Sequence, residues 1–314
     1  MKMREVKRIV VCVCTVMIFM AVFVGCGKTE KSTDKISEEE NFESTESKDE
    51  EKEFGWEVKD DTLYIWGDCD MPNYEDREDA EAPWMKESFT KLVIQEGITR
   101  IGENSFVGCD SLGEISIPNS VVSIGKNAFR GCGLSELNIP SGVISIEQGA
   151  FQNCDLLEKI DISEGLEEIG EDAFSSCDSL VEINIPDSVL SIEDFAFCSC
   201  ISLSEINIPS GVTSIEQGTF QNCDSLEKID IPEGIISIED VAFDGADSLV
   251  EINIPNSVIS IGEEVFRGCD SLRSLMIPDS VTSMDDSFYN CSDELIITYK
   301  GKQYDKDTIS DAFE

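Results

Sequence analysis

The sequence contains no histidine, few basic residues and no hydrophobic run as long as a membrane-spanning helix. Its 314 residues include 23 lysines and arginines against 65 aspartates and glutamates, a formal net charge of −42. The absence of histidine excludes histidine-based acid–base catalysis, histidine-activated nucleophiles and imidazole metal ligands. A surface this acidic repels phosphate backbones, so we expect no nucleic acid partner. With no nucleophile motif, metal-ligand cluster or phosphate loop either, we expect no enzyme activity, metal or cofactor.

The first 25 residues differ in charge from the rest. They carry a net charge of +3, whereas the remainder carries −45. The basic start is followed by the apolar run Ile9 to Val24, which is typical of a secretory signal peptide. The end of this run resembles a bacterial lipobox. The resemblance implies cleavage before Cys26 and attachment of diacylglycerol to its sulfur. The sequence departs from the lipobox at Phe23 and Val24, where Leu and Ala or Ser are commoner. The alternative is an uncleaved anchor, but the run is shorter than the ~20 residues of a spanning helix.

Residues 26–53 have the composition of a disordered tether. Lys, Glu, Ser, Thr and Asp dominate, and Ile36 and Phe42 are the only large apolar residues. Such a segment cannot bury enough apolar surface to fold. We therefore expect an acidic linker between the lipidated Cys26 and a folded domain that begins near residue 54.

The main body of the chain repeats with a 23-residue period. Phenylalanine recurs at this spacing, with two steps of 22, and a cysteine follows each one after three residues except where Ala246 stands. A short fixed period is typical of a solenoid, in which each repeat buries its apolar face against its neighbours. The phenylalanines are Phe106, Phe129, Phe151, Phe174, Phe197, Phe220, Phe243, Phe266 and Phe288, and the cysteines are Cys109, Cys132, Cys154, Cys177, Cys200, Cys223, Cys269 and Cys291.

These eight cysteines are expected to be buried free thiols that act as small core residues. Equivalent residues in stacked repeats lie about one strand spacing apart, ~4.8 Å. The distance between α-carbons alone therefore leaves disulfides open. Bridges between adjacent repeats would break the repeat geometry, which favours free thiols.

Each repeat contains three recognisable pieces. Leu-x-x-Ile-x-Ile, as in Leu203 to Ile208, alternates like a strand with one buried face, and a proline usually ends it. Val-x-Ser-Ile, as in Val258 to Ile261, predicts a second, shorter extended segment. The Ala-Phe-x-x-Cys piece is interpreted as a short helical turn whose Phe and Cys face inward. The Asp that follows most of the cysteines is expected to cap a turn, with calcium ligation as a less favoured alternative.

This repeat, Leu-x-x-Ile-x-Ile-Pro-x-Ser-Val-x-Ser-Ile-x-x-x-Ala-Phe-x-x-Cys, resembles the BspA-like leucine-rich repeat of bacterial cell-surface proteins over about residues 91–291. The resemblance implies a leucine-rich repeat solenoid of about nine repeats with a parallel sheet on its concave face. It also implies surface display, adhesion to host proteins in some members, and no enzyme activity. Residues 54–90 resemble that family's N-terminal cap. Residues 292–314 predict a C-terminal cap, with a hairpin at Lys300-Gly301 and then a short helix.

A longer repeat lies within the short one. Residues 141–162 match residues 210–231 at 19 of 22 positions, an offset of 69 residues or three repeats. This pattern indicates duplication of a three-repeat block. A surface that is repeated along the chain argues against a unique active site and favours a binding or spacer role.

The residues between the apolar strand positions should line the concave sheet and form the candidate ligand-binding face. They are short, polar and mostly acidic, and they lack the aromatic anchors of strong interfaces, so a merely solvated sheet is the alternative. Where Glu and Lys are neighbours in the stack, we expect weak cross-strand pairs. The candidates are Glu114, Glu136, Lys159, Glu182, Asn184, Glu205, Asn207, Lys228, Asp230, Glu251 and Asn253.

Two functions fit these features. The first is a lipid-anchored lipoprotein on the extracellular side of a bacterial membrane that binds or adheres to proteins, with basic host or bacterial surface proteins as partners. The second is a structural or substrate-capturing display module without a single partner. The sequence supports both equally, since both rest on the same repeated polar columns.

Overall fold

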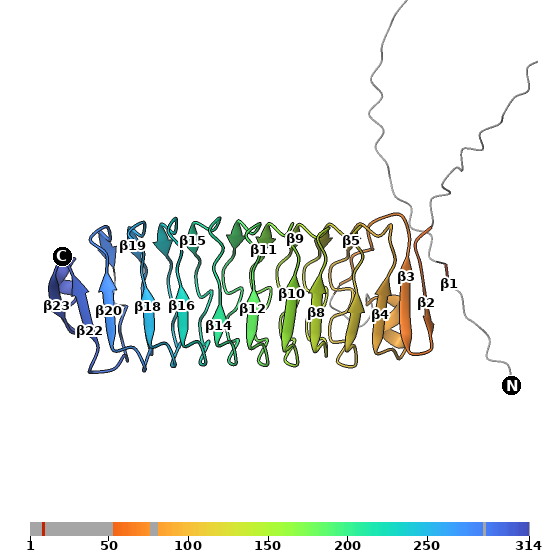
Figure 1. Cartoon of the computed structure of the whole chain (residues 1–314). Helices are drawn as coiled ribbons and strands as arrows, with labels where there is room; N and C mark the ends of the chain where they lie inside the picture. Colours follow the sequence, from red (N-terminus) through yellow and green to blue (C-terminus); the bar gives the residue numbers. More distant parts are fainter. Residues whose placement is uncertain (1–7, 10–52, 76–80, 285–286, 314) are drawn as a thin grey trace, which may run out of the picture.

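The computed structural model describes residues 8–9, 53–75, 81–284 and 287–313. Cys26 and the predicted tether up to residue 52 lie outside the described residues. Of the predicted signal peptide, only β1 (Arg8–Ile9) is described; it pairs antiparallel with β2 (Gly55–Lys59). The folded part is a stack of similar coils that runs nearly straight in the view of Figure 1. Among the described residues, no helix has the length and apolarity required to cross a membrane.

One side of the stack is a sheet of the longer strands, which we call the long-strand sheet. Its strands pair in parallel one repeat apart, so that Ile160 of one strand lies beside Leu137 and Ile183 of its neighbours. The Leu-x-x-Ile-x-Ile pattern therefore forms the predicted strand, with most of its isoleucines buried and Ile115, Ile117 and Ile162 half-buried. The strands are β4 (Lys91–Ile94), β6 (Glu114–Ser116), β8 (Glu136–Ile139), β10 (Lys159–Ile162), β12 (Glu182–Asn184), β14 (Glu205–Ile206), β16 (Lys228–Asp230), β18 (Glu251–Asn253) and β20 (Ser274–Ile277).

The Val-x-Ser-Ile segments form a second parallel sheet of two-residue strands, the short-strand sheet. Most of them are reached through a turn in which the valine N–H donates to the proline carbonyl three residues earlier, as from Val189 to Pro186 at 3.1 Å. The strands are β5 (Arg100–Ile101), β7 (Ser123–Ile124), β9 (Ser145–Ile146), β11 (Glu168–Ile169), β13 (Ser191–Ile192), β15 (Ser214–Ile215), β17 (Ser237–Ile238), β19 (Ser260–Ile261) and β21 (Ser283–Met284).

The third side of each repeat is a run of turns around the ladder phenylalanine. Alternate N–H groups donate to the next repeat, such as Phe129 to Ala150 and Gly131 to Gln152, both at 2.8 Å. The groups between them donate three residues back, such as Cys132 to Phe129 at 3.2 Å. The expected helical turn is thus present only as separate local bonds, because half of the amides serve the stacking of repeats.

This alternation of hydrogen bonds requires the left-handed backbone conformation, with positive φ, at the positions two residues before and two residues after most of the ladder phenylalanines. Asn, Gly, Asp and Ser, which tolerate positive φ, occupy most of these positions. Phe195 and Val241 are bulky exceptions, with φ of 56° and 52°. The Phe195 ring lies over Gly218 of the next repeat, where an added Cβ would come within 2.2 Å of it. Glycine at 218 is therefore required by its neighbour as well as by its own φ of 59°.

The core is a continuous column of phenylalanine rings. Adjacent ladder rings are nearly parallel, with centroids 5.0 Å apart between Phe106 and Phe129 and 6.0 Å apart between Phe197 and Phe220. Trp84 extends the column at the N-terminal end, 5.5 Å from Phe106. All nine phenylalanines are buried, which confirms the inward-facing ladder.

The ladder cysteines fill the space beside these rings, and none is bridged in the part of the chain that the structure describes. From Cys132 onward, each thiol donates to the carbonyl of the ladder phenylalanine in the previous repeat, as from Cys200 to Phe174 at 3.2 Å. Burial raises the pKa of Cys154 and Cys200 to about 12. The column therefore consists of protonated thiols that act as small apolar residues and weak donors.

Different structures cover the two ends of the stack. At the N-terminal end, β2 and β3 (Thr62–Trp66) form an antiparallel hairpin, and η1 (Pro83–Lys86) places Trp84 on the first ring. At the other end, β22 (Ile296–Tyr299) and β23 (Lys302–Tyr304) form the predicted hairpin. The helix expected after it is one short 3-10 turn, η2 (Ser310–Ala312).

The long-strand sheet is interrupted at three places, between β6 and β8, between β14 and β16, and between β18 and β20; at the second of these the short-strand sheet is interrupted too. There β14 and β16 share only an isolated bridge from Asn207 to Asp230, and β13 and β15 belong to different sheets. The turns on the third side stay bonded, with the Phe197 N–H 3.0 Å from the Thr219 carbonyl. This joint coincides with the boundary between the two duplicated three-repeat blocks.

Candidate functional site

The structure aligns the candidate residues in two columns on the long-strand sheet. Glu136 lies beside Lys159, Lys159 beside Glu182, and Glu182 beside Glu205, as the repeat predicts. The second column includes Asn184, which lies beside Asp161. Every candidate side chain is on the outer surface of the sheet, and all are exposed. The geometry of the face is therefore as expected, while its binding role stays a prediction.

The charge pairing on this face differs from the expected cross-strand pairs. Lys159 bonds Asp161 of its own strand at 2.7 Å, and Lys228 bonds Asp230 at 3.3 Å. Both pairs join residues two apart on one strand, which point to the same face. The hydrogen bond to Asp161 is the main reason why the pKa of Lys159 is raised. Among the residues that the structure describes, a cross-strand pair of Lys and Glu forms only between Lys91 and Glu114, at 2.7 Å.

Because the lysines pair along their own strands, several glutamates of the first column have no cationic partner. Glu182 and Glu205 lie directly opposite each other on β12 and β14, and neither forms an ion pair within the described residues. Like charges opposite each other destabilise a sheet. The face thus presents uncompensated negative charge that a basic partner would neutralise.

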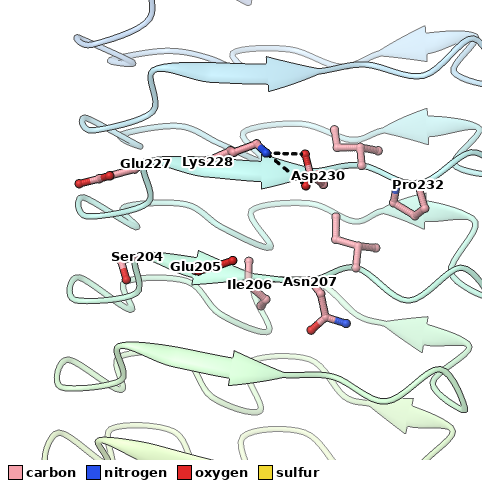
Figure 2. A pocket seen from close by; sticks show the side chains of 10 residues that line it. Ser204, Glu205, Ile206, Asn207, Glu227, Lys228, Asp230 and Pro232 are labelled. Atoms are coloured by element: carbon pink, nitrogen blue, oxygen red, sulfur yellow. Dashed lines mark hydrogen bonds and ion pairs between the residues drawn. The ribbon is translucent and has the colours of Figure 1, made fainter.

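Two shallow depressions lie along this face, each of about 460 Å³. One is bordered by Glu136, Lys159 and Asp161. Figure 2 shows the other, where Glu205 and Asn207 of one repeat face Lys228 and Asp230 of the next. The depression in Figure 2 lies at the joint where β14 and β16 separate. Both hollows are open and have charged side chains at their borders.

Asn207 has a structural role that the sequence pattern did not indicate. Its amide group donates to the Ile185 carbonyl at 2.7 Å and accepts from the Ile185 N–H at 2.8 Å. The side chain thus takes the place of strand-to-strand backbone bonds beside the joint. Of the asparagines in this column, Asn184 and Asn253 remain available to a partner, whereas Asn207 is already bonded within the fold.

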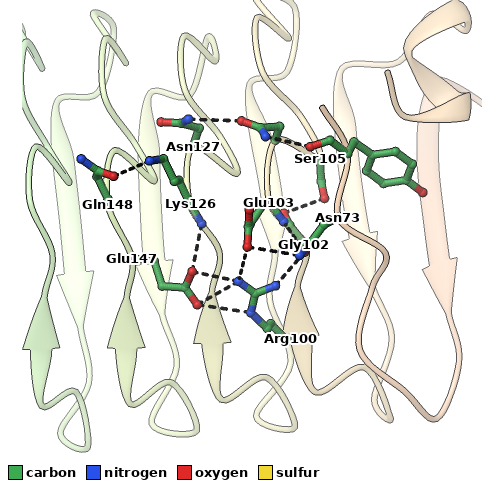
Figure 3. Close-up of polar contacts among 11 residues, drawn as sticks. Asn73, Arg100, Gly102, Glu103, Ser105, Lys126, Asn127, Glu147 and Gln148 are labelled. Carbon is green, nitrogen blue, oxygen red and sulfur yellow. Dashed lines mark hydrogen bonds and ion pairs between the residues drawn. The ribbon is translucent and has the colours of Figure 1, made fainter. Parts of the chain in front are cut away.

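Charged groups elsewhere serve to hold repeats together. Arg100 binds Glu147 across two repeats at 2.8 Å and also contacts Glu103 and Asn73, as Figure 3 shows. The buried carboxylate of Asp244 accepts two hydrogen bonds from Arg267. Neither cluster borders an enclosed pocket, and no group of three or more Cys, Asp or Glu in the described part could hold a metal.

The tryptophans of the N-terminal cap are an alternative place for a binding site. Trp84 is fully buried and its indole N–H donates to the Ser105 carbonyl at 2.9 Å. Trp56 is also buried and packs edge-on against Trp84. These two rings close the core and offer no aromatic anchor to a partner, whereas Trp66, the third tryptophan of the cap, is half-buried.

The aspartates that follow the cysteines do not act as turn caps. Asp155, Asp178, Asp224 and Asp247 accept no hydrogen bond through their carboxylates within the described residues. Burial first, and the neighbouring carboxylates second, raise the pKa of Asp178 and Asp247. They form a stacked acidic column along one edge of the solenoid.

The repeat pattern matches a known family. A family model described as BspA type leucine rich repeat region matches residues 83–203 and 167–296. Among solved structures, the chain is similar to a leucine rich cell surface protein from Faecalibacterium prausnitzii A2-165, at 30% identity over 69% of this chain and 61% of that chain, with a TM-score of 0.44. It is also similar to a leucine rich repeat protein from T. pallidum, at 30% identity over 70% of this chain and 87% of that one, with a TM-score of 0.44.

A third similar structure is the pneumococcal vaccine antigen PcpA, at 18% identity over 79% of this chain and 86% of that chain, with a TM-score of 0.45. The chain spans 61% of the length of the Faecalibacterium protein. No curated protein matches the chain. The family model covers more than half of the sequence, and the stacked repeats carry the same pattern. The chain belongs to the BspA type leucine rich repeat family.

Proposed function

We propose that this protein is a surface-anchored lipoprotein that binds basic proteins through its long-strand sheet. The observation that carries the proposal is the row of exposed glutamates without cationic partners, in which Glu182 and Glu205 lie opposite each other. Stacked like charges oppose folding, so their retention on one face fits a role in binding. A partner that presents lysine or arginine would relieve this repulsion.

Recognition on this face would be electrostatic and distributed over several repeats. No aromatic residue stands among the candidate residues, and interface hot spots favour Trp, Tyr and Arg. Each repeat would then contribute little, and affinity would arise from several weak contacts made together. Adhesion to host or neighbouring-cell surfaces, where many copies of a basic partner are displayed, suits such a face.

Display at the cell surface is supported by the Gly25-Cys26 pattern and by the relatives. The Faecalibacterium protein is described as a leucine rich cell surface protein. Cys26→Ala should abolish incorporation of a labelled fatty acid and release the protein from the membrane fraction, because the substitution removes the sulfur that would carry diacylglycerol. Label incorporation that survives this change would refute the lipid anchor without affecting the binding proposal.

The second candidate is a structural or display module without a single partner. The duplicated surface supports it, since the same columns recur every 69 residues. The two candidates are distinguished by capturing proteins from host matrix and bacterial surface extracts with residues 54–314. A binding protein should retain a small set of basic proteins that elute with salt. A pure display module should retain the same background as a neutral control solenoid.

A further inference from the structure

A second surface column, on the short-strand sheet, combines apolar and acidic residues in a way that the proposed binding face does not. The residue before the serine of each Val-x-Ser-Ile segment points outward. Five of these residues are large and apolar, and each exposes between 43% and 56% of its surface: Val122, Ile144, Leu190, Ile236 and Ile259. We call this row the apolar column.

The repeat geometry places these side chains in one row, at one position per repeat. The Ile144 N–H donates to the Val122 carbonyl at 2.8 Å, and the Ile259 N–H to the Ile236 carbonyl at 2.8 Å. Thr213 and Glu167 occupy the two remaining places between Val122 and Ile259. Val122 with Ile144 and Ile236 with Ile259 form adjacent apolar pairs, and Leu190 lies between the pairs with a polar neighbour on each side. Single scattered apolar residues are normal on surfaces, whereas apolar residues gathered along one face mark an interaction site. At ~4.8 Å per repeat, the row is ~29 Å long.

Acidic residues flank the apolar column on both sides. Exposed Glu164, Asp187 and Glu233 lie in the turn before it, and exposed Glu193 lies after it. Glu216 and Glu239 continue the second flank. Burial, followed by the nearby carboxylates Glu239, Asp194 and Glu193, raises the pKa of Glu216. The only basic residue of this flank between residues 125 and 263 is Lys126, which bonds Gln148.

The charge excludes several occupants. A second copy of this chain would bring its own net charge of −42 against the same acidic flanks. An anionic membrane surface or a nucleic acid would be repelled in the same way. The occupant must therefore present an apolar row bordered by positive charge.

The spacing of the column selects the conformation of that occupant. Same-face residues of an α-helix recur at a pitch of 5.4 Å, close to the ~4.8 Å between repeats. Same-face residues of an extended chain recur every ~6.6 Å and lose register with the column after about two repeats. We propose that the apolar column is a docking surface for a cationic amphipathic helix of about 20 residues, which lies along the stack. This surface is separate from the long-strand sheet and does not depend on the function proposed for that sheet.

The test uses the full chain and a 20-residue synthetic helix with leucines on one face and lysines on the others. The variant replaces Leu190, Ile236 and Ile259 by threonine, the residue that already occupies this column at Thr213 and Thr282. Because the three side chains are half exposed, melting of the variant should match that of the native chain. The dissociation constant for the leucine–lysine helix should rise at least tenfold.

Two further peptides and one further variant complete the design. A serine–lysine peptide of equal charge should bind weakly and equally to both proteins, and a leucine–glutamate helix should not bind. The reversal of Glu182, Glu205 and Glu251 to lysine on the opposite sheet should leave the affinity for the leucine–lysine helix unchanged. Equal affinity of the native chain and the threonine variant would overturn the proposal, as would loss of binding in the long-strand reversal alone.

Discussion

Replacement of Phe197 by alanine tests the stacked core at its most informative position. Phe197 is fully buried, and its ring lies 5.6 Å from Phe174 and 6.0 Å from Phe220. Both sheets are interrupted between the repeats of Phe197 and Phe220. The ring contact therefore carries a larger share of the coupling between these repeats than elsewhere in the stack.

The magnitude follows from burial and from the lost ring contacts. Truncation of a buried phenylalanine to alanine costs about 3–5 kcal/mol. The two ring contacts of ~0.5–1.5 kcal/mol each place Phe197 toward the upper end of that range. A loss of about 4 kcal/mol should lower the melting temperature by roughly 8–16 °C for a domain of this size.

The assay is thermal and urea unfolding of the variant beside two aromatic controls. Tyr289 exposes 61% of its surface although it directly follows the ladder residue Phe288, so Tyr289→Ala should cost less than ~0.5 kcal/mol. Phe42, in the expected tether, should have no effect when replaced by alanine. Equal melting shifts for Phe197→Ala and the two controls would refute the stacked ring column.

Three further predictions concern backbone strain, pH and thiols. Val241→Asn should raise the free energy of unfolding by about 1 kcal/mol, because Asn tolerates the left-handed φ that Val241 adopts. Urea unfolding measures this change, and an unchanged or lower urea midpoint would refute backbone strain at Val241. Because the pKa values of Asp178 and Asp247 are raised, the folded state binds more protons than the unfolded state. The melting temperature should therefore rise as the pH falls from 7 to 5, and a fall would contradict the unpaired acidic column. Cys200 and the other buried ladder cysteines, from Cys132 onward, should resist iodoacetamide at pH 8 in the native protein, since burial raises the pKa of Cys200 to about 12. They should react fully after denaturation without reductant. Mass analysis that finds most of them bridged would overturn the free-thiol column.

The repeat period predicted the fold well because each repeat must stack in register. Once equivalent residues lie side by side, the alternation in Leu203 to Ile208 decides which side chains are buried and which line the outer face. The aligned columns containing Glu182 and Asn184 follow from that register alone. The ladder of rings follows from the same pattern, whereas the C-terminal hairpin was predicted from its own sequence around Lys300-Gly301 and the N-terminal hairpin of β2 and β3 was not predicted.

The features that the sequence did not reveal depend on local geometry. The turn around each ladder phenylalanine was interpreted as helical because its Phe–x–x–Cys spacing suits a helix. The signal for the actual conformation was present in the Asn, Gly and Ser residues two places after each phenylalanine, which favour positive φ. At the position two residues before the ladder phenylalanine, Phe195 and Val241 also adopt positive φ. Neither residue type favours that conformation, so nothing in the sequence indicated it there.

Side-chain pairing could not be derived from column membership. Lys159 has glutamates on both sides in the stack but bonds Asp161 on its own strand, since both arrangements lie within reach of a long side chain. The joint between β14 and β16 also left no mark in the repeat consensus. Its position at the boundary of the duplicated blocks is visible in the sequence, but the separation of the sheets there is not.

The most direct test of the proposed function measures binding to the long-strand sheet as a function of salt. The protein captured from surface extracts is titrated against residues 54–314 and against the variant in which Glu182, Glu205 and Glu251 are reversed to lysine. All three glutamates are exposed, so the melting temperatures of the two proteins should agree. The account predicts that native affinity falls with salt, because exposed charges are screened within ~8–10 Å, and that the reversal weakens binding. Affinity and salt dependence that survive the reversal would contradict the central claim that this face binds proteins.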